Sequence, residues 1–225
     1  MEIRPIGMDT PKGMLVIISG PSGSGKGTVV RQLDSNRGFA LSISMTTRDP
    51  RPGEEHGRDY FFVNEEEFIA ARDSNGLLEH AVFVGNLYGT PRDYVEKEIE
   101  QGKVVVLEIE VEGALQIREK FPEAVLIFLM PPDIAELARR LSGRHTEDKM
   151  TIEQRLIRAK NEIKYISRYD YVVINDEVEL AVDRINTIVL AESLKPCRNS
   201  ELTQNFKGDE FDVASFILRI DELTK

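Results

Sequence analysis

The segment "GPSGSGKGT", from Gly20 to Thr28, places the strongest constraint on how this chain can fold. The apolar run "MLVIIS" (14–19) precedes it, and the helical pattern "TVVRQLD" (28–34) follows it. A short continuous apolar run is typical of a strand buried on both faces of a parallel sheet. A strand, a glycine-rich loop with the spacing G-x-x-x-x-G-K and a helix, in that order, predict a phosphate-binding loop. Its backbone N–H groups would point at an anion, and Lys26 would add positive charge.

This loop departs from the common motif immediately after the lysine. A Ser or Thr usually follows and binds Mg²⁺, but here Gly27 follows and the hydroxyl comes one residue later, on Thr28. We expect Thr28 to reach a phosphate oxygen and the metal to be held mainly by phosphates and water. That arrangement disfavours a GTPase-like mechanism and favours phosphoryl transfer between two nucleotides. The alternative is a glycine-rich turn that merely begins a helix.

The remaining chain alternates between strand and helix patterns. Strands are predicted at 39–44, 103–110, 124–130 and 171–175, and helices at 111–121, 132–143, 151–169 and 177–192. Thr151 and Gln154 have the spacing of a capping box at the start of the long helix. Such alternation predicts an α/β fold with a parallel sheet covered by helices on both faces.

Residues 45–97 lack the long apolar runs of a central sheet, which predicts a small mixed subdomain. Within this region "FFV" (61–63) and "LLEHAVFVG" (77–85) indicate strands, and "EEEFIAARD" (65–73) indicates a helix. Thr90 as cap, Pro91 in the first turn and Gly102 at the end predict a further helix.

Composition limits the classes of function. A chain of 225 residues, 41% apolar and 30% charged, suits one soluble α/β domain with an inserted subdomain. The net charge of -10 argues against nucleic-acid binding, although a local cluster of arginines can still bind small phosphates. No apolar run approaches the ~20 residues that span a bilayer, and no signal-peptide pattern is visible. With Cys197 as the one cysteine and three widely spread histidines, we expect a cytoplasmic protein without disulfide or structural zinc.

A second phosphate site is predicted in "SMTTRDPRPGEEHGRDY" (44–60). Arg48, Arg51 and Tyr60 lie on one loop after a strand. Guanidinium groups match the oxygens of a monophosphate, and a tyrosine hydroxyl can add a hydrogen bond. The alternative is a solvated basic loop.

Taken together, the motifs resemble the guanylate kinase family over about residues 14–195. The matching segments, in order, are "GPSGSGKGT", "SISMTTRDPRPGEEHGRDYFFV", "LLEHAVFVGNLYGTP", "VVLEIEVEGA", "RRLSGRHTED" and "YDYVVINDE". The resemblance implies a P-loop NTPase-type parallel sheet flanked by helices, with a small mixed GMP-binding subdomain and a mobile lid. It also implies that ATP and GMP are converted to ADP and GDP, with Mg²⁺ as cofactor.

On the GMP side, the resemblance implies two groups of contacts. The GMP phosphate would be held by Arg48, Arg51, Tyr60 and Tyr88. The guanine pocket would be formed by Ser44, Glu79, Thr90 and Glu110. A carboxylate accepts both the N1–H and N2–H₂ donors of guanine, whereas adenine presents an acceptor at N1 and would be repelled. Without the resemblance, Glu79 in a half-polar strand would read as a solvated carboxylate.

On the ATP side, the resemblance implies that the phosphate loop and two distant residues bind the nucleotide. These residues are Gly20, Pro21, Ser22, Gly23, Ser24, Gly25, Lys26, Gly27, Thr28, Arg140 and Asn175. Lys26, Arg48, Arg144 and Arg155 would stabilise the phosphoryl group during transfer, and a closed lid would exclude water. Arg139 and Arg158 are instead expected to form ion pairs on the helix surface, and His145 to be exposed and noncatalytic.

Glu108 and Glu110 end an apolar strand, where parallel sheets bind ligands. Many family members carry Asp at both places. We expect Thr28 and Glu108 near Mg²⁺, directly or through water, although Glu108 could equally orient Lys26 or a bound water.

The expected organisation is an N-terminal tail (1–13), one domain (14–195) and a C-terminal tail (196–225). The domain would have a core (14–44 and 103–195), the GMP-binding subdomain (about 45–97) and the lid (about 140–155). Apolar residues of the C-terminal tail predict a helix that docks on the domain or on a partner chain; they are Phe211, Val213, Phe216, Ile217, Ile220 and Leu223. The chain would act as a monomer or homodimer.

Two other functions remain open. One is a kinase for another nucleoside monophosphate, which Glu79 and Glu110 oppose in the case of AMP. The other is a noncatalytic module of the same fold that binds proteins, which the presence of Lys26 and the arginines opposes.

Overall fold

The structure is a computed structural model that describes residues 13–33, 38–142 and 149–199. The predicted C-terminal helix, Arg144 and His145 lie outside these residues. Among the described helices, none is both long and apolar enough to cross a membrane.

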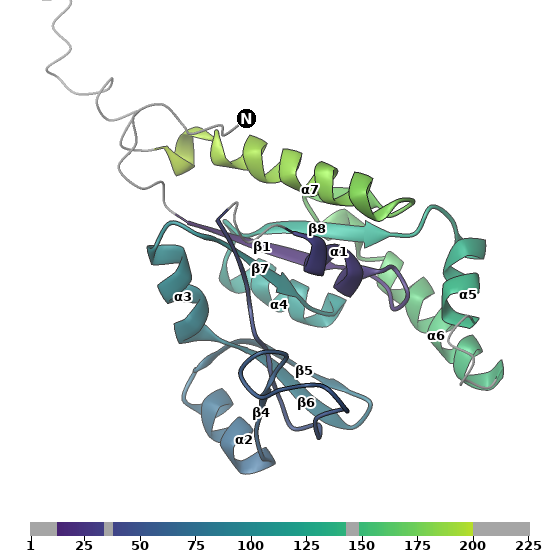
Figure 1. Cartoon of the computed structure of the whole chain (residues 1–225), viewed down its shortest axis with the longest axis horizontal. Coiled ribbons are helices and arrows are strands. Elements are labelled where there is room, and N and C mark those ends of the chain that lie inside the picture. Colours follow the sequence, from purple (N-terminus) through teal and green to yellow (C-terminus); the bar gives the residue numbers. More distant parts are fainter. Residues whose placement is uncertain (1–12, 34–37, 143–148, 200–225) are drawn as a thin grey trace, which may run out of the picture.

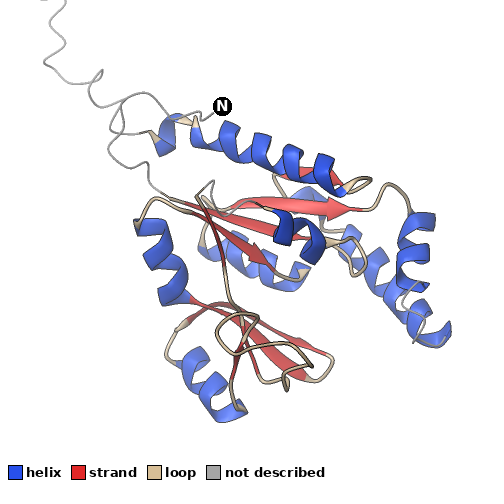
Figure 2. Ribbon diagram, in the orientation of Figure 1, coloured by secondary structure: helices blue, strands red, loops and turns tan. Residues whose placement is uncertain are grey.

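A five-stranded parallel sheet forms the core, in the order β2-β7-β1-β8-β9 (Figures 1 and 2). Its strands are β1 (Met14–Ser19), β2 (Phe39–Leu41), β7 (Val104–Glu108), β8 (Val125–Met130) and β9 (Tyr171–Ile174). The predicted α/β fold is therefore confirmed.

The two faces of this sheet are covered by different helices. Successive side chains of a strand point to opposite faces, so Val16 and Ile18 join one buried cluster, whereas Leu15 and Ile17 join the other. The first cluster includes residues of α1 (Lys26–Gln32) and α7 (Val178–Ser193). The second includes residues of α3 (Arg92–Glu100) and α4 (Val111–Lys120). Burial on both faces explains why these strands read as continuous apolar runs.

The inserted region forms a second sheet beside the core, in the order β4-β3-β6-β5 (Figure 1). Its strands are β3 (Met45–Thr46), β4 (Phe61–Phe62), β5 (Leu77–Phe83) and β6 (Asn86–Pro91). β3 pairs with β4 in parallel, and the other pairs are antiparallel. Helix α2 (Glu65–Asp73) begins with a capping box between Asn64 and Glu67. The predicted mixed subdomain is present, but β3 and β6 were not predicted.

Several predicted boundaries are wrong. Thr90 belongs to β6 and does not cap α3, because its hydroxyl donates to the buried Glu79. Thr151 lies inside α6 (Lys149–Ile163), so the capping-box pattern does not mark its start. That helix also ends sooner than predicted and is followed by a short 3₁₀ turn, η2 (Ile166–Arg168). The remaining elements are α5 (Ile134–Ser142) and a second 3₁₀ turn, η3 (Pro196–Arg198).

Candidate active site

The glycine-rich loop joins the carboxyl end of β1 to α1, as its sequence predicts. Gly20 has a φ of 148°, and a Cβ there would lie 2.2 Å from the carbonyl oxygen of Leu129. Gly25 has a φ of 91°, and its Cβ would lie 2.3 Å from the side-chain nitrogen of Asn175. Both positions require glycine, because an added side chain would meet backbone or a buried amide.

Two side chains from distant elements hold this loop. Asn175, at the end of β9, is buried and donates from Nδ2 to the carbonyl oxygen of Ser24 at 2.8 Å. Arg140, on α5, donates to the carbonyl oxygens of Asn175 at 2.9 Å and Ser24 at 3.4 Å. Arg140 and Asn175, the two residues outside the loop that were predicted to bind ATP, therefore contact the phosphate loop and stabilise its backbone conformation.

Lys26 lies inside the loop. Its side chain is 7% exposed, and Nζ donates to the carbonyl oxygen of Gly20 at 2.6 Å. Nζ also lies 3.7 Å from Oε1 of Glu110. A buried ammonium beside several N–H groups is suited to binding phosphate oxygens.

The residue that replaces the usual hydroxyl, Gly27, faces a carboxylate. A Cβ at Gly27 would lie 3.3 and 3.4 Å from the two carboxylate oxygens of Glu108, and 3.6 Å from Nη2 of Arg31. Glu108 keeps solvent contact at the end of β7, but desolvation by the surrounding protein raises the pKa of its carboxylate, while the charges of Lys26 and Arg31 lower it. Thr28 is exposed in the first turn of α1. Sequence reasoning did not single out Arg31, although it follows Gly27 by one helical turn.

The second cationic site forms on the inserted sheet. Nη2 of Arg48 donates to both carboxylate oxygens of Glu54, at 3.0 and 2.9 Å. The guanidinium of Arg48 also lies 5.5 Å from the ring centroid of Tyr60, which in turn packs edge-on against Tyr88. The backbone N–H of Arg51 donates to Oε2 of Glu54 at 2.8 Å, and the Arg51 side chain is exposed. Two of the other predicted phosphate contacts, Tyr60 and Tyr88, therefore lie beside the Arg48 guanidinium, and Arg51 is on the same loop.

Glu54 was not predicted, yet it occupies the centre of this cluster. A carboxylate three residues after Arg51 was the available signal, since paired arginines need a counter-charge. Burial raises the pKa of Tyr60, and the charge of Glu108, at the end of β7, raises it further.

Glu79, on β5, is buried and not solvated. Its side chain is 3% exposed and accepts a hydrogen bond from Oγ1 of Thr90 at 2.7 Å. On its other side, a Cβ at Gly113 of α4 would lie 2.4 Å from Oε2 of Glu79. Burial raises the pKa of Glu79 to about 7, and the hydrogen bond from Thr90 opposes that shift. Ser44, between β2 and β3, is partly buried.

Glu110 precedes α4 and lies between two cations from different helices. Besides Lys26, Nη2 of Arg158 on α6 is 3.5 Å from its Oε2. Arg158 also donates from Nε to Oε1 of Glu162 at 2.8 Å. The prediction of a surface ion pair therefore holds for Arg139, which pairs with Glu136, but is incomplete for Arg158.

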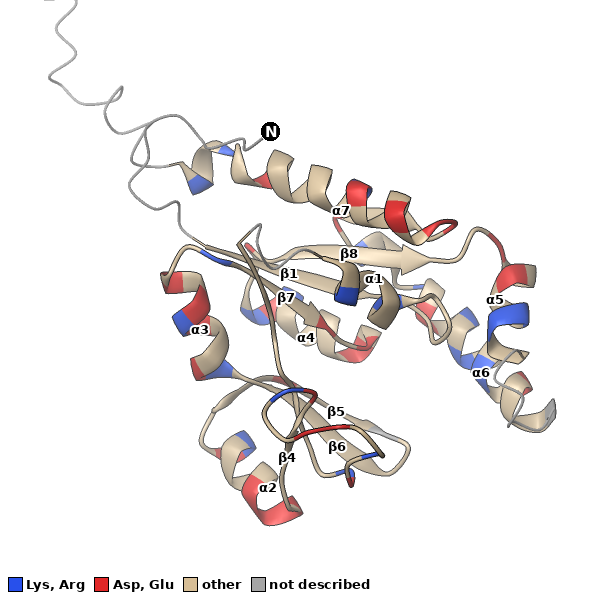
Figure 3. Ribbon diagram, in the orientation of Figure 1, with Lys and Arg blue, Asp and Glu red and all other residues tan. Residues whose placement is uncertain are grey.

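Charges gather on both sides of this site (Figure 3). Basic residues lie along α5 and α6, and both signs occur in the loop beside β4. Arg155 lies on α6, one turn before Arg158.

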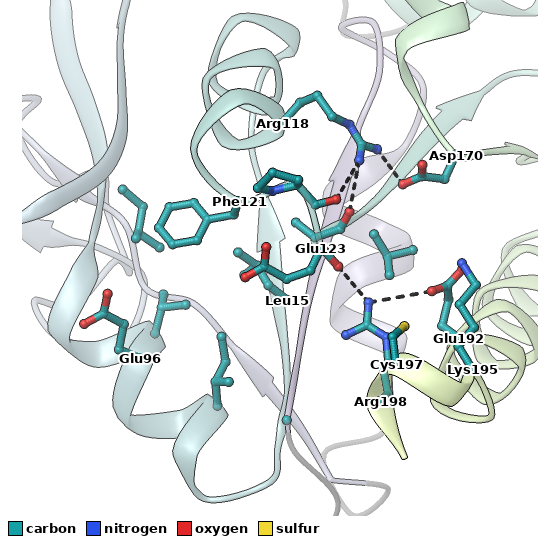
Figure 4. A pocket seen from close by; sticks show the side chains of 17 residues that line it. Leu15, Glu96, Arg118, Phe121, Glu123, Asp170, Glu192, Lys195, Cys197 and Arg198 are labelled. Atoms are coloured by element: carbon teal, nitrogen blue, oxygen red, sulfur yellow. Dashed lines mark hydrogen bonds and ion pairs between the residues drawn. The ribbon is translucent and has the colours of Figure 1, made fainter. Parts of the chain in front are cut away.

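A separate cavity of about 340 Å³ lies near the amino ends of β1 and β8 (Figure 4). It is lined by apolar residues such as Leu15 and Phe121 and by paired charges. Nη2 of Arg118 lies 2.5 Å from Asp170, and Nη2 of Arg198 lies 3.6 Å from Glu192. No predicted site residue lines this cavity.

Comparisons with known proteins agree with this arrangement. The family model described as guanylate kinase matches residues 12–192. A guanylate kinase of Halalkalibacterium halodurans is 52% identical over 88% of this chain and 97% of its own length. One of Latilactobacillus sakei is 51% identical, over 82% of this chain and 92% of its own length. The crystal structure of guanylate kinase from Anaplasma phagocytophilum superposes with a TM-score of 0.72 and 36% identity, covering 88% of this chain and 96% of that one.

Proposed function

This chain belongs to the guanylate kinase family, and we propose that it transfers the γ-phosphoryl group of ATP to the phosphate of GMP, giving ADP and GDP. ATP would bind at the loop between β1 and α1, and GMP would bind between the second sheet and the carboxyl end of β7.

The buried carboxylate of Glu79 is the observation that best supports GMP as the acceptor. An acceptor in an apolar pocket selects a base that offers adjacent N–H donors, because an unmatched partner leaves a buried polar group unpaired. Guanine offers N1–H and N2–H₂, and adenine does not. Glu110 would accept further donors of the base, and Ser44 and Thr90 would donate to its O6 or N7.

Arg48 and its neighbours would bind the GMP phosphate. In the structure both carboxylate oxygens of Glu54 accept from one nitrogen of Arg48, Nη2, so a phosphate would share or replace that interaction. Two arginines and the hydroxyls of Tyr60 and Tyr88 supply the donors that a phosphate dianion accepts.

Positive charge would lower the barrier to transfer. The phosphoryl group carries its charge on the equatorial oxygens, so catalysis depends on positioning and on pre-placed cations. Lys26 would hold the transferring phosphate from the loop side, while Arg155 and Arg144 would approach from the lid. Arg140 and Asn175 would keep the loop in shape and border the ATP site.

The residues present fit a Mg²⁺ ion. The carboxylate of Glu108 lies over Gly27, at the position from which a loop hydroxyl would otherwise act. Carboxylate and hydroxyl oxygens suit Mg²⁺, which keeps several waters and phosphate ligands. Glu108 and Thr28 would hold the ion, directly or through water. When bound, Mg²⁺ would neutralise charge that develops on the phosphates.

A coupled assay of ADP release with GMP, AMP and dTMP as separate acceptors tests the proposal. We expect GMP to be used fastest by a large factor. Faster turnover of AMP or dTMP would indicate a kinase for another nucleoside monophosphate, and no turnover with tight GMP binding would indicate a noncatalytic module.

We further propose a cytoplasmic monomer or homodimer that binds neither nucleic acid nor membranes, in keeping with the net charge of -10.

A further inference from the structure

We propose that Arg158 is a positioning residue, which holds the Glu110 carboxylate in the guanine pocket and ties that pocket to helix α6. The inference rests on the proposed function, because it assigns Arg158 a part in GMP recognition. The sequence pattern favoured an ordinary surface pair for this arginine. Its contact with Glu110, far away in the chain, points to a different role.

The contacts form a chain of alternating charges across three helices. Lys26 of α1 lies 3.7 Å from Oε1 of Glu110, whose Oε2 lies 3.5 Å from Nη2 of Arg158. Nε of Arg158 donates to Oε1 of Glu162 at 2.8 Å. Arg158 thus uses two nitrogens of its guanidinium, one for each carboxylate, which a point charge cannot do with the same geometry.

The carboxylate oxygens beside Arg158 are buried, so the loss of this cation would leave their charge less well compensated. Oε2 of Glu110 and Oε2 of Glu162 are buried, and neither accepts a hydrogen bond from the described residues. Burial raises the pKa of Glu162; the hydrogen bond from Arg158 opposes this shift, and the charge of Glu110 adds to it. Glu110 keeps 30% of its side chain exposed, but two neighbouring carboxylates with buried oxygens still repel each other unless a cation lies between them.

Without Arg158, Glu110 would keep its ion pair with Lys26. The carboxylate would turn toward Lys26 and away from Glu162, and it would leave the position from which it meets the base. GMP binding should therefore suffer more than the chemical step. Because Arg155 lies one turn earlier on α6, the same bridge would make the position of that arginine sensitive to GMP.

The first test compares Arg158→Gln with Arg158→Lys and with the wild-type enzyme. We expect Arg158→Gln to raise KM for GMP about tenfold, the scale of one charge-assisted interaction, with less than about a threefold change in kcat or in KM for ATP. Arg158→Lys should recover part of the loss. Arg139→Gln is the matched control, since Arg139 is exposed and pairs with Glu136 on α5, and it should behave as wild type.

The second test is a double-mutant cycle with Glu110→Gln, read by calorimetric GMP binding without ATP. If Arg158 acts through Glu110, Arg158→Gln should change GMP affinity little in the Glu110→Gln background. Equal losses in both backgrounds, or unchanged KM for GMP in both Arg158 variants, would overturn the proposal. If Arg158→Gln does not fold, the Arg158→Lys measurements decide, since we expect that variant to raise KM for GMP about two- to threefold.

These outcomes are separable from failure of the proposed function. If wild-type enzyme prefers another monophosphate, the function is wrong whatever the variants do. If wild-type enzyme uses GMP and the Arg158 variants match it, only the role of Arg158 is wrong.

Discussion

The phosphate loop and the guanine side of the site are built in opposite ways. The loop is one contiguous segment that follows β1, a strand in which every residue is buried. Its shape is held by hydrogen bonds that a loop carbonyl accepts from Asn175 and Arg140. The guanine side is assembled from strands that are only partly buried and from side chains that pair with one another, as Arg48 does with Glu54.

This difference indicates different modes of binding. A loop fixed by backbone geometry needs little rearrangement to accept a phosphate, so the entropy cost of ordering the loop is met during folding and not on binding. On the other side, the incoming phosphate would share or replace the contact between Glu54 and Arg48, and Glu79 must be ionised to accept the base. We therefore expect changes to the loop to affect turnover, and changes to the second sheet to affect GMP use and its pH dependence.

Lys26→Ala should have the largest effect. Removing the buried ammonium takes away charge where phosphoryl oxygens gather, so kcat should fall about a hundredfold or more, while GMP affinity measured by calorimetry stays near that of the wild-type enzyme. Near-normal turnover would show that the loop is not the catalytic ATP site.

Glu79→Gln should lower kcat/KM for GMP by about tenfold to a hundredfold, or ~1–3 kcal/mol, because the amide presents a donor to a base that needs two acceptors. The measurement is a comparison of GMP and AMP as acceptors. An unchanged ratio of their kcat/KM values would remove Glu79 from base recognition.

The GMP affinity of the free enzyme should depend on pH through Glu79. Its pKa of about 7 lies above the ordinary value of 4.5, so the carboxylate is ionised above about pH 7, and affinity should fall up to about tenfold per pH unit below it. Calorimetry between pH 5.5 and 8 measures this. Glu79→Gln is the control, since it retains the titration of the GMP phosphate and should lose only the step near 7.

The raised pKa of Glu79 also predicts that the folding stabilities of the wild-type protein and Glu79→Gln differ with pH. Because the pKa is raised in the folded state, Glu79 contributes stability that is fully present below about pH 4.5 and is lost as pH rises through about 7. Without nucleotide at pH 8, Glu79→Gln should therefore be more stable than wild type, by up to about 3 kcal/mol. Chemical denaturation of both proteins at about pH 4.5 and at pH 8 checks the sign of this stability difference.

Gly113→Ala should weaken GMP use by a smaller amount. The new Cβ would lie 2.4 Å from Oε2 of Glu79, so the carboxylate must move, and KM for GMP should rise about fivefold to tenfold. Alanine also favours the helix by ~1 kcal/mol. An unchanged KM with a stabilised helix would mean that the position of Glu79 is not critical.

Gly27→Ser should have the smallest effect. The serine would place its Cβ in tight contact with Glu108, and its hydroxyl could donate to that carboxylate. We expect kcat within about threefold of wild type, measured at several Mg²⁺ concentrations. A large loss would mean that an uncrowded Glu108 is essential.

Much of this site could be predicted because its motifs are contiguous. The loop, the Arg48–Tyr60 segment and the strand ending at Glu108 each carry their own pattern, and the predicted parallel sheet is confirmed. The boundaries that failed depended on tertiary contacts. Thr90 has the pattern of a helix cap, but the buried carboxylate of Glu79 takes its hydroxyl.

The sequence by itself determined the order of strands and helices in the core, the phosphate loop and membership of a kinase family, because backbone periodicity and glycine placement are local properties. Only the tertiary structure decided that Glu54 pairs with Arg48, that Gly113 makes room for Glu79, and that Arg158 reaches Glu110. The physical reason is that partners far apart in the chain meet only through packing, so the meaning of a charged residue depends on which buried group it faces.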